Sequence, residues 1–179
     1  DGPLAERGGF DGVGQAMSGA MHMTGTPGHP VKSAAPYVDY STAVLSAFGT
    51  LANLGRHVQP SPVISVTASD GEVIYQAPPR ADQVVEPAIA AEAVDILKGV
   101  VQSGTGVGAN IGRPQFGKTG TAQNASDAWF VGAVPQMATA VWVGFPQGQV
   151  PMCCGNVRIS TVYGGTWPAS IWRAFMLAA

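Results

Sequence analysis

Three runs of strand-forming residues follow one another between residues 116 and 145, with only short connections between them. The runs are 116–122, 128–134 and 138–145, and they are rich in Val, Phe, Trp and Thr, which favour strands. Connections of a few residues suit antiparallel neighbours, because parallel strands need a long crossover. The sequence therefore predicts three adjacent antiparallel strands in chain order.

Helical periodicity appears on both sides of these runs. Apolar residues recur every three or four positions over 40–54, and Gly55 follows as a C-terminal stop. A second helix is expected to begin at Pro87, where a missing N–H is tolerated, and to end before the glycine-rich loop 103–108. A third is expected over 167–177. Strand-like runs at 63–66 and 73–75, joined by Asp70-Gly71, predict a hairpin. Helices before and after an antiparallel sheet indicate an α+β fold.

Composition excludes several classes of function. Apolar residues make up 46% of the chain and charged residues 11%, as in a globular domain. The net charge of −2, with no cluster of Lys and Arg, argues against nucleic-acid binding. Three His and two Cys lack metal-ligand spacing, so neither a metal nor a cofactor is expected. No apolar run reaches the roughly 18 residues of a membrane span, and any membrane anchor is expected outside this chain.

The two cysteines, Cys153 and Cys154, are neighbours in sequence. Neighbouring cysteines cannot link distant segments, so no disulfide framework is predicted. Two alternatives remain: a strained vicinal disulfide, or two thiols with no special role. The second alternative is the expectation from sequence.

Two segments differ in how clearly they can be interpreted. Residues 1–36 show neither a helical nor a strand period, and we predict an irregular segment there. Residues 37–179 carry all the periodic elements and are predicted to form one structural unit.

Residues 112–119 match the phosphate-loop pattern G-x-x-x-x-G-K-[ST]. That pattern binds phosphate when it follows a buried strand and begins a helix. Here a glycine-rich loop precedes it and a strand-like run follows. A nucleotide-binding protein is therefore kept only as an unfavoured alternative.

Lys118-Thr119-Gly120 is a K-T-G triplet of the kind found in β-lactamases and penicillin-binding proteins. On a strand beside an active site, Lys118 would supply a positive charge near the reacting groups. Thr119 and Thr121 would offer hydroxyl groups to a substrate. Gly120 has no Cβ, so a substrate backbone can approach closely. We take Lys118 as the candidate catalytic residue and Thr119, Gly120 and Thr121 as candidate substrate-binding residues.

The residues around this triplet resemble class A, bifunctional penicillin-binding proteins. The resemblance covers roughly residues 40–179, in order. It is carried by the segments 48–55, 61–75, 116–122, 127–132, 139–144 and 164–172. The chain is therefore identified as similar to the C-terminal part of a penicillin-binding transpeptidase domain.

This resemblance implies an antiparallel sheet of about five strands flanked by helices, incomplete on its N-terminal side. It implies a serine acyltransferase that cross-links peptidoglycan stem peptides ending in D-Ala-D-Ala and is trapped by β-lactams. It also implies a place at the extracytoplasmic face of a bacterial cell membrane.

The sequence departs from the family in two motifs. No serine begins S-x-x-K, and the nearest form, Ser170-Ile171-Trp172-Arg173, ends in an arginine that cannot accept a proton. No serine begins S-x-N. The nucleophile is therefore expected outside this chain, which alone is expected to be inactive. The alternative is a non-catalytic binding or scaffolding remnant of the same fold.

Overall fold

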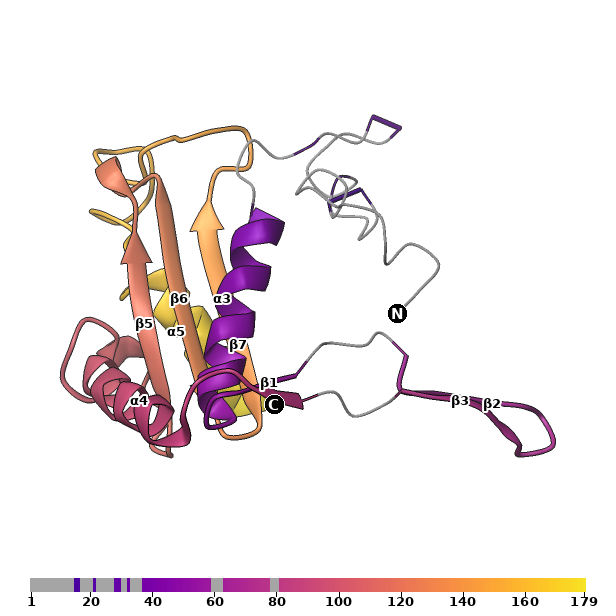
Figure 1. Cartoon of the computed structure of the whole chain (residues 1–179). Helices are drawn as coiled ribbons and strands as arrows, with labels where there is room; N and C mark the ends of the chain where they lie inside the picture. Colours follow the sequence, from indigo (N-terminus) through magenta and orange to yellow (C-terminus); the bar gives the residue numbers. More distant parts are fainter. Residues whose placement is uncertain are drawn as a thin grey trace.

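The computed structural model describes residues 15–16, 21, 28–29, 32, 37–58, 63–77 and 81–179. The prediction of an irregular segment over 1–36 falls almost entirely outside these residues. All the described α-helices of eight or more residues pack around one three-stranded sheet, and two short two-stranded sheets lie outside it (Figure 1).

The principal sheet consists of β5 (Phe116–Thr121), β6 (Asp127–Val134) and β7 (Met137–Gly144). The strands are antiparallel in the order β5-β6-β7, so β5 lies at one edge. This confirms the three strands predicted from sequence, with bounds shifted by one residue at most. The resemblance implied about five strands, whereas the described residues place three in this sheet.

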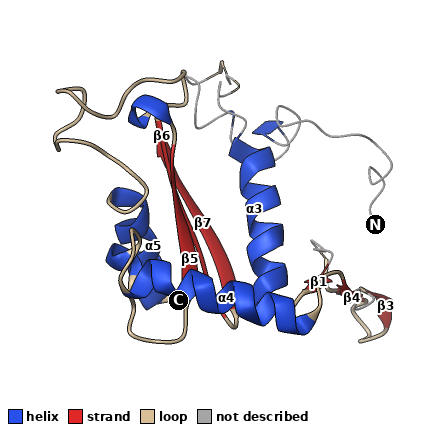
Figure 2. Ribbon diagram, turned by 60° about the vertical axis from the view of Figure 1, so that its left-hand side comes forward, coloured by secondary structure: helices blue, strands red, loops and turns tan. Residues whose placement is uncertain are grey.

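Two helices cover opposite faces of the sheet. Figure 2 shows α3 (Tyr37–Ala52) on one face and α5 (Trp167–Ala178) on the other, and both contact β6 and β7. The third helix, α4 (Pro87–Gln102), contacts β5. Proline stands in the first turn of both α4 and α5, where its missing N–H leaves no intrahelical bond unmade. The three predicted helices and the α+β class are confirmed.

The core lies between the sheet and α5. Trp172 and Phe130 are almost fully buried and meet edge to face, with ring centroids 5.3 Å apart. The indole Nε1 of Trp172 donates to the carbonyl oxygen of Thr139 at 3.2 Å. Small and aliphatic side chains complete this cluster: Val101, Ala109, Val134, Ala169 and Met176.

Two short sheets lie outside the principal one. β1 (Arg56–Val58) pairs with β4 (Ala81–Gln83), and β2 (Ser65–Thr67) pairs with β3 (Val73–Gln76). The β2–β3 hairpin projects away from the sheet (Figure 1) and its strand residues are all exposed. It confirms the predicted hairpin. Two single-turn 3₁₀ helices, η1 (Val107–Ala109) and η2 (Gln123–Ala125), flank β5.

Gly55 belongs to the turn that closes α3, which ends at Ala52, two residues before the predicted end at residue 54. Its φ of +83° is in the left-handed region, which glycine enters without steric cost. Its N–H donates to the carbonyl oxygen of Thr50 at 2.8 Å. A Cβ here would also come within 2.1 Å of the Val85 carbonyl oxygen, so the position excludes other residues.

Across the described ranges, no helix has both the length and the apolar character to cross a membrane.

Candidate active-site strand

β5 presents the K-T-G residues at the edge of the principal sheet. Lys118 is exposed, and its ammonium donates to the Thr119 carbonyl oxygen at 2.8 Å. Thr119 and Gly120 are partly exposed and Thr121 is exposed, whereas the start of the strand is buried. β6 pairs with one edge of β5, and the other edge of β5 has no neighbouring strand in the described sheet. Such an edge can accept an extended peptide through main-chain hydrogen bonds.

Thr119 is held by a residue from the loop after α4. The hydroxyl oxygens of Thr119 and Thr105 are 2.7 Å apart and share a hydrogen bond. Thr105 belongs to the glycine-rich loop 103–108, which the sequence marked only as the end of a helix. This loop therefore lies beside β5 and forms one side of the candidate site.

Thr121 is held by the segment that precedes α5. The buried Gly164 N–H donates to the Thr121 hydroxyl at 3.1 Å. Gly164 also lies very close to the strands, because a Cβ there would come within 2.3 Å of the Trp129 carbonyl oxygen and 2.7 Å of the Gly120 carbonyl oxygen. Only glycine allows this approach. Sequence reasoning included Gly164 in a family resemblance but gave it no role.

The contact between Thr121 and Gly164 gives a stability prediction. Thr121→Val keeps the shape and the β-branch of the side chain but leaves a buried N–H without its acceptor. Because the Gly164 N–H is buried and would be left unsatisfied, we expect a loss of about 1–3 kcal/mol in the free energy of unfolding, measured by urea denaturation. Thr121→Ser keeps the hydroxyl and is the matched control. Equal stability of the Val variant and the wild type would show that this hydrogen bond contributes nothing.

The phosphate-loop alternative lacks its structural context. Lys118 lies within β5, and no helix begins there. A phosphate loop needs a helix N-terminus at this point to direct N–H groups at the ligand. The structure thus agrees with the sequence-based preference against a nucleotide site.

Asp127 anchors the start of β6. One carboxylate oxygen accepts the Trp142 indole N–H at 3.0 Å, and the other accepts the Ser126 hydroxyl at 3.1 Å. Trp129 and Trp142 lie side by side at opposing positions of β6 and β7, with ring centroids 6.4 Å apart. These contacts join β6 and β7, and β5 pairs with β6.

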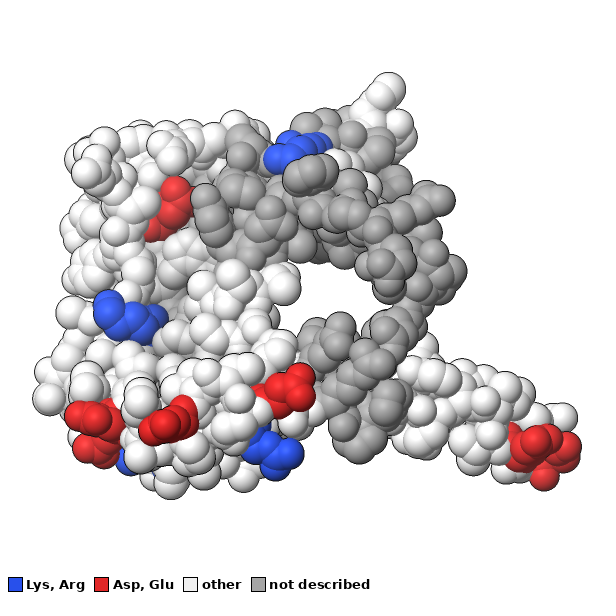
Figure 3. Space-filling view, in the orientation of Figure 1, with Lys and Arg blue, Asp and Glu red and all other residues white. Residues whose placement is uncertain are grey.

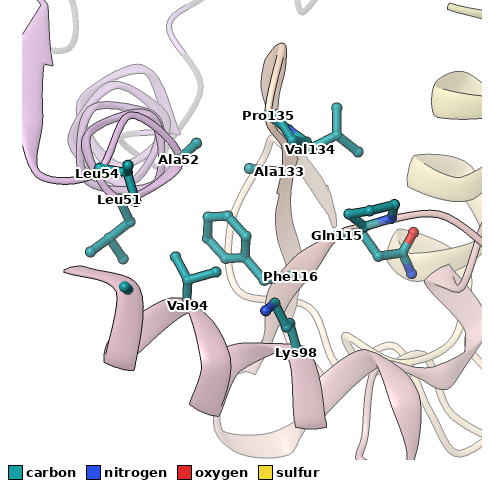
Figure 4. Close-up of a pocket in the computed structure, with 12 residues that line it drawn as sticks. Leu51, Ala52, Leu54, Val94, Lys98, Gln115, Phe116, Ala133, Val134 and Pro135 are labelled. Carbon is teal, nitrogen blue, oxygen red and sulfur yellow. The ribbon is translucent and has the colours of Figure 1, made fainter. Parts of the chain in front are cut away.

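The cavity in Figure 4 lies apart from the K-T-G residues. It has a volume of about 240 Å³ between α3, α4, the start of β5 and the turn after β6. Its walls are largely apolar, with Lys98 and Gln115 as polar members. Phe116 lines it, but none of the residues 118–121 does. The candidate site is therefore the exposed strand and its two flanking loops, not this cavity.

Charges are sparse around the site. On the face in Figure 3, basic side chains are scattered, and acidic ones lie both over α4 at the lower left and at the tip of the β2–β3 hairpin, whose turn contains Asp70 and Glu72. Within the described part of the chain, no group of three or more His, Cys, Asp or Glu side chains is placed to hold a metal ion.

Curated proteins and solved structures that resemble most of this chain are penicillin-binding proteins. Penicillin-binding protein 1A of Mycolicibacterium smegmatis is 32% identical over 177 residues, which covers 92% of this chain and 22% of that protein. The solved structure of the penicillin-binding protein PonA1 from Mycobacterium tuberculosis is 32% identical, with a TM-score of 0.66 over 76% of this chain and 37% of that chain. Penicillin-binding protein A from M. tuberculosis, solved as an imipenem acyl-enzyme complex, is 28% identical with a TM-score of 0.57 and covers 75% of this chain. The chain spans about a fifth of the length of the curated relatives that it matches.

A family profile described as CoA-transferase family III matches residues 1–92, just over half of the chain. The match contains the segment 1–36, which has no clear period in the sequence. It ends inside α4, before the whole principal sheet and the K-T-G residues. The similarity to penicillin-binding proteins extends over the larger share of the chain and includes its fold.

Residues 1–92 thus match CoA-transferase family III, while the chain as a whole belongs to the penicillin-binding proteins and is similar to part of their transpeptidase domain.

Proposed function

We propose that this chain supplies the substrate-binding strand of a serine-type D,D-transpeptidase. The enzyme would cross-link peptidoglycan stem peptides at the extracytoplasmic face of a bacterial cell membrane. The observation that carries the proposal is the open edge of β5, where the K-T-G residues are exposed at the side of the sheet. An extended stem peptide would add to this edge as a further strand.

The candidate residues take distinct roles in this proposal. Lys118 brings a positive charge beside the substrate carboxylate and the nucleophile. Thr119 and Thr121 offer hydroxyls, whose positions are fixed by Thr105 and Gly164. Gly120 lets the substrate backbone approach, and a main-chain N–H on β5 would stabilise the oxyanion of the tetrahedral intermediate.

β-Lactams are proposed as ligands of the same strand. Support comes from the related penicillin-binding protein A, which was solved as an acyl-enzyme complex with imipenem and also with ceftriaxone. A β-lactam that imitates the D-Ala-D-Ala end would place its carboxylate near Lys118 and Thr119.

The nucleophile of the proposed reaction comes from an S-x-x-K motif outside this chain. Ser170 is exposed on α5, and the residue in the place of the motif's lysine is Arg173. The Arg173 guanidinium is occupied in donating to the Asn110 carbonyl oxygen at 2.9 Å. Covalent catalysis needs a nucleophile with a nearby base, and neither side chain meets that need.

The test compares this chain with a longer protein that carries it together with upstream S-x-x-K and S-x-N motifs. A fluorescent penicillin should label the longer protein covalently, at the S-x-x-K serine identified by peptide mass. The 179-residue chain should remain unlabelled under the same conditions. A longer protein that folds but is not labelled would favour the scaffolding alternative, and a labelled serine within this chain would overturn the proposal.

A further inference from the structure

Cys153 and Cys154, the only two cysteines of the sequence, lie in the long connection between β7 and α5. Cys154 is exposed and Cys153 is half-buried, and both are free thiols. Their side chains contact one another, and the two thiols share a hydrogen bond. Cys154 has a φ of +60° and Gly155 a φ of +94°, so the chain turns sharply at the pair. This left-handed turn presents both sulfurs on the same side.

The backbone on both sides of the pair is anchored. Cys153 forms an antiparallel bridge with Thr161, and the Val162 N–H donates to the Met152 carbonyl oxygen at 2.9 Å. The Met152 N–H in turn donates to the Ala125 carbonyl oxygen at 2.9 Å. Met152 and Val162 are buried together with Ala128 in a small apolar cluster separate from the main core. Hydrogen bonds and buried side chains therefore hold the backbone on both sides of the cysteine pair, which keeps the two thiols together.

We propose that Cys153 and Cys154 form a reactive vicinal dithiol, which small-molecule disulfides oxidise to an intramolecular disulfide. This differs from the expectation of two idle thiols. Sequence alone left both alternatives open because it gives neither the exposure nor the orientation of adjacent side chains. The proposal is independent of the acyl transfer proposed above.

The reaction proceeds by two thiol–disulfide exchanges. The Cys154 thiolate attacks one sulfur of the small disulfide, which forms a mixed disulfide and releases one small thiolate. The Cys153 thiolate then attacks the Cys154 sulfur and releases the second small thiolate. Two protein thiols are oxidised, one disulfide is reduced to two small thiols, and the two protons of the protein thiols pass to these products.

Exposure favours Cys154 as the first to react, and the raised pKa of Cys153 disfavours that residue. The hydrogen bond with Cys154 raises the pKa of the Cys153 thiol, which lowers its thiolate fraction. Cys154 is also the more accessible of the two. Once the mixed disulfide has formed, that hydrogen bond is gone and Cys153 is adjacent to the sulfur it must attack.

The resulting disulfide is expected to be easily reduced. Adjacent Cα atoms lie about 3.8 Å apart across a trans peptide, whereas most disulfides join Cα atoms about 4.4–6.8 Å apart. Strained and exposed disulfides have more oxidising potentials and are the labile ones. The pair therefore fits reversible modification better than structural cross-linking.

The experiment treats the chain with oxidised glutathione near pH 8, close to the usual thiol pKa of about 8.5, and measures the intact mass. The wild type should lose the mass of two hydrogens, with no retained glutathione, and a mild reductant should restore it. Cys153→Ser and Cys154→Ser should each retain one glutathione as a mixed disulfide. A wild type that retains glutathione or does not react would overturn the proposal.

A second measurement uses a ligand that needs both thiols. Phenylarsine oxide, a trivalent arsenical, should protect both cysteines of the wild type from alkylation by iodoacetamide. The remaining thiol of either serine variant should stay open to alkylation. If the arsenical protects neither cysteine of the wild type, the two sulfurs do not act as a pair and the proposal fails. Neither measurement depends on penicillin binding or transpeptidation.

Discussion

Replacing Lys118 by alanine, in a longer protein that carries this chain and an S-x-x-K serine, is expected to slow acylation by penicillin about 10²- to 10³-fold. Lys118 is exposed at the sheet edge, where its charge would face the incoming carboxylate and the developing negative charge. The loss corresponds to roughly 3–4 kcal/mol of transition-state stabilisation. The measurement is the second-order rate constant of acylation with a chromogenic or fluorescent penicillin.

Two further variants make this result interpretable. Lys118→Arg should restore the rate only in part, because the planar guanidinium is larger and stays protonated, so it cannot relay a proton. Lys98→Ala removes another lysine, which lies on α4 and contacts Asp95 at 3.3 Å, and should leave the rate unchanged. If Lys118→Ala acylates within about threefold of the wild type, a change of less than 1 kcal/mol, Lys118 is an ordinary strand lysine.

Trp172→Ala is expected to cause a large loss of stability, about 3–5 kcal/mol in the free energy of unfolding. The side chain is 1% exposed and packs edge to face on Phe130. Its removal leaves a cavity between α5 and the sheet and frees the Thr139 carbonyl oxygen from its indole partner. For a domain of this size, thermal unfolding should shift downward by about 6–20 °C.

Phe175→Ala is the matched control for this cavity. Phe175 is an aromatic residue on the same helix, but 49% of it is exposed. Its replacement should cost much less than that of Trp172, with a shift in melting temperature of a few degrees at most. Equal destabilisation by the two variants would mean that α5 does not pack on the sheet through Trp172.

The larger elements could be predicted because their sequences favour one kind of secondary structure. Strands β5, β6 and β7 are rich in β-branched and aromatic residues, and α4 has apolar residues at helical spacing with Pro87 at its start. β1 and β4 were not predicted. Each has only three residues, too few to show a period, and they pair across an intervening hairpin.

The candidate site could be predicted only in part. Lys118, Thr119 and Gly120 could be identified because they are consecutive in sequence and form a recognisable motif. Thr105 and Gly164 were missed as members of the site, because their contacts to β5 join segments that are distant in sequence. Gly164 in particular matters through the side chain it lacks, and only the folded backbone shows what a Cβ would meet.

The open edge of β5 also bears on self-association. An unpaired strand that accepts a peptide can equally pair with the same strand of a second molecule, which is a common beginning of aggregation. A lysine on an edge strand opposes such pairing by charge repulsion, and Lys118 is the charged residue of β5. Lys118→Ala therefore removes a barrier to aggregation as well as a candidate catalytic group, and its acylation rate is best measured on protein confirmed as monomeric by light scattering.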